Sequence, residues 1–157
     1  VFYTDGDFQY DVTELKKLFS KLNQRVDIVQ GYKVKRNDPW YRILIGDIYN
    51  FGVKFLFDIK ISDVDCDFRL IRRKVFEKVQ LNHKSGVITV EMVKKFQDAG
   101  FKFSEVPVSH FNRTYGRSQI FNFKRIARIL IELVELWKEL VFKKWQKRIS
   151  LKTEKYL

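Results

Sequence analysis

The apolar residues of this chain change their spacing several times along its 157 residues, and this alternation is the feature that most constrains the fold. Short runs rich in Val, Ile, Phe and Tyr are typical of strands. They are separated by longer stretches in which apolar residues recur every three or four positions, as they do on one face of a helix. Strand-like and helix-like segments that follow one another in this way predict a layered α/β domain in which helices cover a sheet.

Turn and capping residues divide the chain into its expected elements. Strands are expected at residues 1–4, 26–31, 68–71 and 101–108. Helices are expected at 12–23, from Asp38-Pro39 to 57, and at 74–79, 87–99 and 119–149. Asp11 and Glu14 predict a capping box for the first helix, and Gly100 predicts the end of the fourth. Four strands with an exposed first strand would make an incomplete sheet, which suggests that an upstream part of the domain precedes this chain.

The formal net charge of +12 is concentrated near the end of the chain. Residues 111–157 hold twelve Lys and Arg against four Asp and Glu. Such a basic segment can bind nucleic acid, an anionic membrane surface or a phosphorylated substrate, and charge alone does not choose among them. The single cysteine, Cys66, excludes an internal disulfide and predicts a reducing, cytoplasmic environment. The sequence has no run of about 18 uncharged apolar residues, so no spanning segment is expected.

An acidic loop directly follows the first expected strand. It carries the carboxylates of Asp5 and Asp7 and the amide of Gln9. Ligands of α/β sheets bind at the carboxyl ends of strands, and oxygen ligands suit Mg²⁺ or Mn²⁺. Such a cation could stabilise a leaving diphosphate. A bare Asp-x-Asp is also common turn chemistry, so both interpretations stay open at this point.

Residues 5–11, Asp-Gly-Asp-Phe-Gln-Tyr-Asp, resemble the Asp-x-Asp-x-Gln segment of family 2 glycosyltransferases. Further stretches match that family in the same order, at residues 29–33, 42, 63–73 and 106–118. The chain is similar to the dolichyl-phosphate mannosyltransferase kind, which transfers sugars to polyprenyl phosphates, over roughly residues 1–130. This resemblance implies a GT-A-like, Rossmann-like sheet, of which residues 1–118 would form the C-terminal part.

The resemblance also implies site roles. Asp5 and Asp7 would be catalytic, and Asp7 and Gln9 would hold Mg²⁺ or Mn²⁺. The acceptor phosphate would be bound by a set of basic and polar residues: Lys33, Arg42, Arg113, Arg117 and Ser118. The implied reaction is the inverting transfer of a hexose or N-acetylhexosamine from a nucleotide sugar to a dolichyl or undecaprenyl phosphate. The acceptor oxygen is already anionic, so no strong general base is expected.

Departures from the family pattern lie at three positions. Lys33 stands where arginine is common, Asp67 replaces a usual glycine, and Gly46 lies near a serine of some relatives. The family's Pro-x-x-Asn-Glu stretch and the acid that contacts the nucleotide base would lie upstream of this chain. We therefore expect that this chain alone does not bind the nucleotide-sugar donor.

Residues 119–157 are interpreted as an amphipathic, basic helix and tail. Their apolar face carries Phe123, Ile126, Leu130, Leu133, Trp137, Leu140, Val141 and Trp145. Lysines and arginines surround this face, as in helices that lie in an anionic leaflet, which predicts a peripheral protein at the cytoplasmic face of a membrane. The alternative is that this face packs on the sheet or on a second subunit of a homo-oligomer.

Other readings of the site stay open. A transferase acting on a soluble saccharide or protein would need a carboxylate base, for which Asp63 and Asp65 are candidates. With Asp67 they could form a second metal site, or they could orient Arg69, Arg72 and Arg73 or a neighbouring loop. A non-catalytic basic binding fragment is a further reading. Nucleic acid is disfavoured, because the basic residues share a helix with a continuous apolar stripe. His83 and His110 lack ligand spacing.

Overall fold

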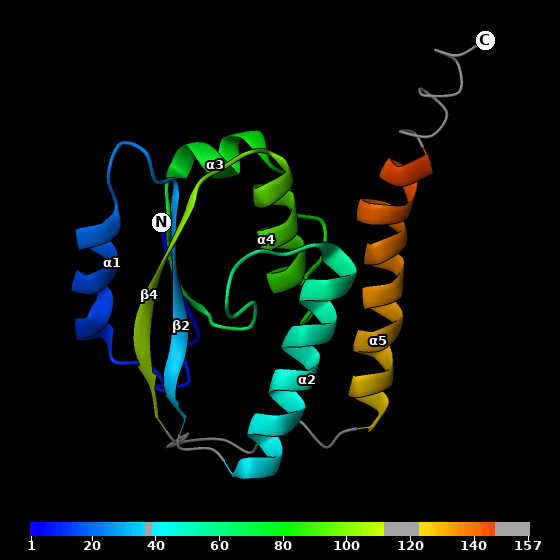
Figure 1. Cartoon of the computed structure of the whole chain (residues 1–157), viewed down its shortest axis with the longest axis horizontal. Coiled ribbons are helices and arrows are strands. Elements are labelled where there is room, and N and C mark those ends of the chain that lie inside the picture. The colour runs from blue at the N-terminus through cyan, green and yellow to red at the C-terminus, as the bar shows by residue number, and fades with distance from the viewer. Residues whose placement is uncertain (37–38, 112–122, 147–157) are drawn as a thin grey trace.

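A computed structural model of the chain describes residues 1–36, 39–111 and 123–146 (Figure 1). The strands are β1 (Phe2–Thr4), β2 (Ile28–Arg36), β3 (Phe68–Ile71) and β4 (Phe103–His110). The helices are α1 (Leu15–Lys21), α2 (Trp40–Phe57), α3 (Arg73–Lys78), α4 (Ile88–Asp98) and α5 (Phe123–Trp137). A 3₁₀ turn (Val12–Glu14) precedes α1, and a π-helical segment (Lys138–Phe142) continues α5.

Within the described residues the strands form one mixed sheet in the order β1-β3-β2-β4. Strand β3 is antiparallel to both of its neighbours, whereas β2 and β4 run parallel. In Figure 1, α1 lies on one side of this sheet, and α4, α2 and α5 lie on the other. The predicted α/β class is confirmed, and this open four-stranded sheet is compatible with part of a GT-A-like domain.

The second strand was predicted too short. It continues from Ile28 to Arg36 because β4 pairs with it along its whole length, from Ile28 opposite Phe103 to Arg36 opposite His110. Residues 29–33 therefore lie wholly inside a strand. Gly31 permits close packing at this point, since a Cβ atom would lie 3.0 Å from the carbonyl oxygen of Phe68.

Only half of the predicted capping box forms. The Asp11 carboxylate accepts from Thr13 N at 2.8 Å and caps the first turn. Glu14 does not reach back to Asp11. Its carboxylate accepts instead from Ser109 N and Ser109 Oγ, both at 3.0 Å, and so ties the start of α1 to the end of β4.

The core has one apolar cluster on each face of the sheet and a third between the helices. On the α1 side, Leu18 packs against Val29, Phe68 and Val106. On the other side, Ile28 and Ile71 pack against Met92 and Phe96 of α4. The third cluster joins α2, α4, α5 and the chain between α2 and β3, with these buried members: Val53, Phe57, Ile59, Ile61, Val64, Val87, Val90, Val93, Leu133, Leu136 and Leu140.

Helix α5 is therefore partly a core element. Leu133 and Leu140 of the predicted apolar face are buried in the third cluster, together with Leu136 beside them, so this part of the face packs among α2 and α4 and not on the sheet. Leu130 and Trp145 remain more than half exposed, at 54% and 58%. Across the described part of the chain, no helix combines the length and the apolarity that crossing a membrane requires.

Candidate active site

A cavity of about 580 Å³ lies where the end of β1, the strand β2 and the first turns of α2 meet. Its lining includes Asp5, Asp7, Gln9, Lys33 and Arg42, each of which was a predicted site residue. The structure thus brings together acidic and basic candidates that lie up to 37 positions apart in the sequence. The other predicted acceptor residues, Arg113, Arg117 and Ser118, lie outside the described residues.

The acidic loop holds its shape through short-range bonds. Asp7 Oδ1 accepts from Gln9 N at 3.2 Å, and the amide nitrogen of Gln9 donates to the Phe111 carbonyl at 3.0 Å. The backbone N–H of Phe111 returns a bond to Gln9 O at 2.8 Å. Phe8 adopts a left-handed φ of 58° and is exposed. A bulky residue rarely takes this conformation, and such strain is concentrated at functional loops.

The donor set of this loop fits a hard divalent cation. Asp7 supplies a carboxylate at the cavity, and Gln9 supplies an amide oxygen whose partner nitrogen is fixed by Phe111. Three further carboxylates, those of Asp5, Asp65 and Asp67, line the same cavity. Over residues 1–36, 39–111 and 123–146, however, no group of three or more His, Cys, Asp or Glu is arranged to hold a metal ion. A cation here would need oxygen atoms from a ligand as well.

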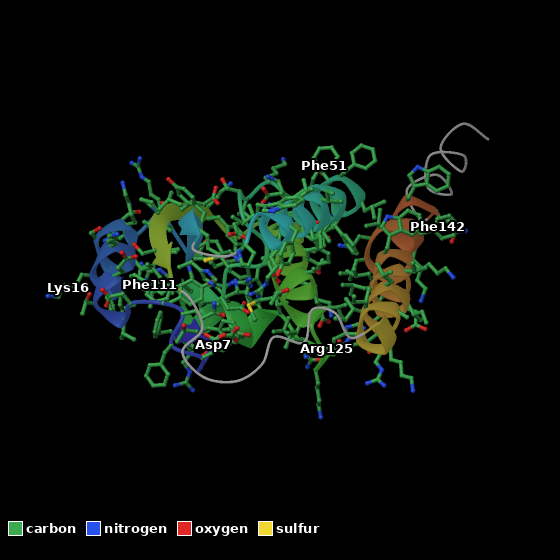
Figure 2. All side chains as sticks on the ribbon, turned by 90° about the horizontal axis from the view of Figure 1, so that it is seen from below. Asp7, Lys16, Phe51, Phe111, Arg125 and Phe142 are labelled. Atoms are coloured by element: carbon green, nitrogen blue, oxygen red, sulfur yellow. The ribbon has the colours of Figure 1, made fainter. Side chains whose placement is uncertain are left out.

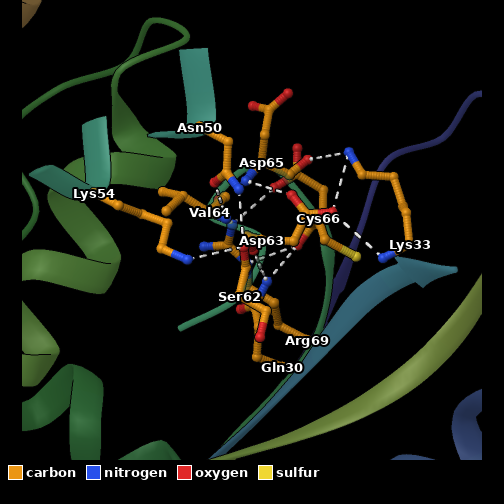
Figure 3. A network of polar contacts seen from close by, with 11 residues as sticks. Gln30, Lys33, Asn50, Lys54, Ser62, Asp63, Val64, Asp65, Cys66 and Arg69 are labelled. Atoms are coloured by element: carbon orange, nitrogen blue, oxygen red, sulfur yellow. Dashed lines mark hydrogen bonds and ion pairs between the residues drawn. The ribbon is translucent and has the colours of Figure 1, made fainter. Parts of the chain in front are cut away.

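The loop between α2 and β3 carries a dense polar network (Figure 3). Asp63 is buried, and its carboxylate accepts from Lys33 N at 3.3 Å and Asp65 N at 3.1 Å. It also lies 3.6 Å from Lys33 Nζ, which in turn donates to the Asp65 carbonyl. Asn50 of α2 bonds to both Val64 N and Ser62 O. Asp63 therefore holds the loop in place. It does not line the cavity, so it is not placed to act as the base that a saccharide acceptor would need.

Buried Arg69 organises the same loop from within the sheet. Its guanidinium donates to Cys66 O at 3.0 Å and Val64 O at 2.7 Å, and it lies 3.4 Å from Asp67 Oδ1. The prediction that the aspartates of this loop orient neighbouring arginines thus holds for Arg69. It is wrong for two others. Arg72 donates to the carbonyls of Val26 and Asn23, and Arg73 pairs with Glu77.

Asp67 is a carboxyl group of the cavity whose protonation is shifted by its surroundings. Burial raises the pKa of Asp67 to about 7, and Asp5 and Asp65 add to the rise, while Arg69 opposes it. Burial also raises the pKa of Tyr3 in the same wall, with the charges of Asp67 and Asp5 acting in the same direction. The Arg69 guanidinium lies 5.9 Å from the Tyr3 ring centroid. Burial and the neighbouring carboxylates thus both favour the protonated forms of Asp67 and Tyr3 in this wall.

The lining also includes residues that the sequence did not single out. Lys84 and Ser85 come from the loop before α4, Arg125 comes from α5, and His110 ends β4. His110 was predicted to be an ordinary polar residue, yet it lines the cavity and packs its ring against Tyr10. No local motif marks these residues. Only the parallel pairing of β4 and the packing of α5 bring them to the cavity.

Two acids, one buried and one half-buried, hold the loop that carries Lys84. Glu91 of α4 is fully buried and accepts from the backbone N–H groups of Asn82 and His83 at 2.9 Å and 3.0 Å. Glu132 of α5 accepts from the Ser85 hydroxyl. One wall of the cavity is thus fixed jointly by α4 and α5.

Comparison with known proteins adds to this geometry. No family model matches the chain. Over 124 residues, 74% of its length, the chain is 27% identical to "Polyprenol monophosphomannose synthase" of Mycolicibacterium smegmatis. Over 130 residues, 83% of its length, it is 25% identical to "Undecaprenyl-phosphate 4-deoxy-4-formamido-L-arabinose transferase" of an Enterobacter species. The matches cover 47% and 38% of these relatives, so the chain spans less than half of either.

The fold and the cavity define an α/β protein with an acidic loop at the end of a strand and basic residues opposite it. The relatives specify the class further. The predicted resemblance to family 2 glycosyltransferases of the polyprenyl-phosphate kind is confirmed at modest identity over most of this chain.

Proposed function

We propose that this chain carries the acceptor side of an enzyme that transfers a sugar from a nucleoside-diphosphate sugar to a polyprenyl phosphate. The observation that carries the proposal is the single cavity that joins Asp5, Asp7 and Gln9 to Lys33 and Arg42. The acidic group and the basic group each serve one of the two phosphorylated reactants. The leaving diphosphate needs a cation held by oxygen ligands, and the acceptor phosphate needs basic side chains. The names of the two relatives support the acceptor class.

The proposed reaction is one displacement with inversion. A phosphate oxygen of the acceptor forms a bond to the anomeric carbon of the sugar, and the bond between that carbon and the diphosphate oxygen breaks with its electron pair. A phosphate monoester is largely dianionic at neutral pH, so no strong base has to remove a proton. The protein's task is then to position the two anions and to offset their charge.

Residues of this chain divide that task. Asp7 and Gln9 would hold Mg²⁺ or Mn²⁺, which supplies charge stabilisation to the leaving diphosphate. Asp5 lies in the same loop, on the proposed sugar-nucleotide side. Lys33 is fixed by Asp63 and the Asp65 carbonyl, and Arg42 projects from the first turn of α2 into the cavity. These two cations would orient the acceptor phosphate. Arg113, Arg117 and Ser118 stay predicted members of the same set.

Replacing Asp7 tests the proposal. Asp7→Ala should abolish transfer to a polyprenyl phosphate when a panel of nucleoside-diphosphate sugars is offered to the complete polypeptide with Mg²⁺ or Mn²⁺. Binding of Mn²⁺ to the chain, followed by electron paramagnetic resonance, should weaken in the same variant. Asp47→Ala is a matched control, because Asp47 is an exposed acid of α2 outside the cavity lining. Undiminished transfer by Asp7→Ala, or transfer in excess chelator, would overturn the metal assignment.

A soluble saccharide is the second candidate acceptor, because Asp65 lines the cavity and is exposed there. A sugar hydroxyl must lose a proton during attack, so a carboxylate base would raise its rate by about a hundredfold or more. Asp65→Asn separates the two acceptors. A small change in transfer to polyprenyl phosphate supports the first proposal, and a hundredfold loss with a saccharide acceptor would favour the second.

A further inference from the structure

A second pair of basic residues, Lys84 and Arg125, lines the same cavity as Lys33 and Arg42. Lys84 lies in the loop before α4, and Arg125 lies in the first turn of α5. Figure 2 shows Arg125 and Asp7 along the same side of the molecule, away from Phe51. The second pair therefore reaches the cavity from other elements than β2 and α2, which supply the first pair.

Lys84 and Lys33 differ in their contacts. Lys33 Nζ lies 3.6 Å from the Asp63 carboxylate and donates to the Asp65 carbonyl at 3.1 Å. Lys84 is exposed, and its ammonium group forms no hydrogen bond or ion pair within the described part of the chain. An ammonium group carries three donors, so Lys84 keeps all of them for a ligand of the cavity.

The two acids that hold the loop leave the charge of Lys84 unpaired. Glu91 accepts from two backbone N–H groups that precede Lys84, and it pairs with Lys95 at 2.6 Å. Glu132 accepts from the hydroxyl of Ser85, directly after Lys84. The residues on both sides of Lys84 are therefore fixed, while its positive charge stays available to the cavity.

The acidic side of the cavity needs a ligand that brings oxygen atoms of its own. Asp7 and Gln9 offer two oxygen ligands there, and the described residues hold no group of three or more His, Cys, Asp or Glu arranged for a metal ion. Mg²⁺ takes about six oxygen ligands and is usually bound by one or two carboxylates together with substrate phosphates. A diphosphate provides such oxygens and has further anionic oxygens that a basic side chain can bind.

We propose that Lys84 binds the diphosphate of the sugar donor from the α4 side of the cavity, with Arg125 of α5 contributing a second positive charge. The inference rests on the proposed function for the identity of the leaving group. Each phosphorylated reactant then has its own pair of cations, because Lys33 and Arg42 bind the acceptor phosphate. As the bond to the anomeric carbon breaks, the diphosphate gains negative charge, which a fixed ammonium group stabilises.

Isothermal titration calorimetry of the full chain with inorganic pyrophosphate tests this role, with Mn²⁺ in excess and without sugar or lipid. Lys84→Ala should weaken binding about tenfold, because a charge-assisted contact is lost. Lys84→Arg keeps the charge and should recover most of the affinity. Lys78→Ala is the matched control, because Lys78 is an exposed lysine at the end of α3 outside the cavity lining, and it should bind like the unchanged chain.

A double-mutant cycle tests Glu132 as a positioning residue that acts through the loop of Lys84. Glu132→Ala should weaken pyrophosphate binding about threefold, the effect of one neutral hydrogen bond. Added to Lys84→Ala, it should cause no further loss, because the group that it positions is already gone. Glu135→Ala, which removes an exposed acid of the same helix, should leave the affinity unchanged. Equal losses from Glu132→Ala with and without Lys84 would contradict this positioning role.

Three results would overturn the assignment of Lys84. The first is a pyrophosphate affinity in Lys84→Ala equal to that of the unchanged chain or lowered no more than in Lys78→Ala. The second is a lack of pyrophosphate binding by the unchanged chain. The third is a loss confined to a short prenyl phosphate, which would place Lys84 with the acceptor. Circular dichroism shows whether each variant is folded, and Lys84→Gln replaces Lys84→Ala if that variant unfolds.

Failure of the proposed function is seen separately. Sugar transfer is measured on the complete polypeptide, whereas pyrophosphate binding needs neither a sugar nor a lipid. Binding that depends on Lys84 in a polypeptide without transfer would reject the proposed function and keep the diphosphate contact. Transfer by a polypeptide whose pyrophosphate affinity does not depend on Lys84 would do the reverse.

Discussion

Helices α4 and α2 are both rich in apolar residues, yet they use them in opposite ways. α4 buries seven of its 11 residues, including Glu91 and Lys94, between the sheet and the other helices. α2 has 18 residues and buries only Val53 and Phe57. Apolar content therefore does not decide burial here. The difference indicates that α4 contributes most of its apolar surface to the core, whereas most of the apolar surface of α2 does not.

The largest expected effect tests this difference with one substitution in each helix. Phe96 of α4 is 1% exposed and packs edge-on against Phe76, and Phe51 of α2 is 73% exposed. Phe96→Ala should lower the free energy of unfolding by about 3–5 kcal/mol, because it leaves a cavity in the core. Phe51→Ala should change it by less than about 0.5 kcal/mol. Urea unfolding followed by circular dichroism measures both, and similar losses in the two variants would contradict the comparison.

A second prediction compares the two faces of α2. Arg42→Ala should weaken binding of a short, water-soluble prenyl phosphate by about thirtyfold, because a charge-assisted contact of this kind contributes about 2 kcal/mol. Leu44→Ala, on the exposed face two residues away, should leave that affinity unchanged. Isothermal titration calorimetry on the chain measures both. Equal affinities in the two variants would show that Arg42 does not contact the phosphate.

Residues with local signals were the ones the sequence could predict. Strand β3 was predicted at its observed bounds. Pro39 marked the start of α2, and Gly100 marked the end of α4. The acidic loop was found because Asp-x-Asp-x-Gln is compact in sequence, and Arg42 and Lys33 came from the family resemblance. The structure brings all of them to one cavity.

What the sequence could not predict depends on contacts between distant segments. The length of β2 is set by β4, about 75 residues later, and no local residue marks its end. Glu14 has the right spacing for a capping box, but the Ser109 hydroxyl and N–H compete for it. Periodicity shows that α5 and α2 are amphipathic without showing which apolar residues meet another element. The burial of Leu136 and the exposure of Phe55 are therefore tertiary properties.

A third prediction compares a buried carboxyl group with a half-buried one. Burial alone would raise the pKa of Glu91 in α4, but bonds from Lys95, Asn82 and His83 outweigh it and hold the pKa below its usual range. Its contribution to stability is present above the ordinary carboxyl pKa and is lost as the pH falls through the lowered value. Asp67 has the opposite sign, because burial raises its pKa to about 7. The folded chain keeps this proton at pH values where the unfolded chain has lost it, so stability falls as the pH rises from the ordinary carboxyl pKa to about 7 and levels off above that value.

The unchanged chain should therefore lose about 2 kcal/mol of unfolding free energy relative to Asp67→Asn between about pH 5.5 and about pH 8.5, nearly all of it below about pH 7. Glu91→Gln should show no such divergence from the unchanged chain over that range. Glu91 is ionised there in both the folded and the unfolded chain, and glutamine carries no charge at any pH. Urea unfolding at the two pH values measures the difference. A pH-independent effect of Asp67→Asn would mean that the carboxyl group is ionised throughout.

The smallest expected effect uses the same substitution at a glycine of each helix. A Cβ atom added at Gly52 of α2 or at Gly100 after α4 would have nothing within 4 Å, so the backbone decides the outcome. Gly52 lies inside a helix, where alanine is favoured, and Gly52→Ala should raise the free energy of unfolding by about 0.5–1 kcal/mol. Gly100 has φ +81°, and Gly100→Ala should lower it by about 1 kcal/mol. The backbone at the end of α4 thus requires glycine, whereas α2 can be stabilised by replacing its glycine with alanine. Urea unfolding measures both changes. A loss of stability in Gly52→Ala would instead show that α2 is as tightly constrained as α4.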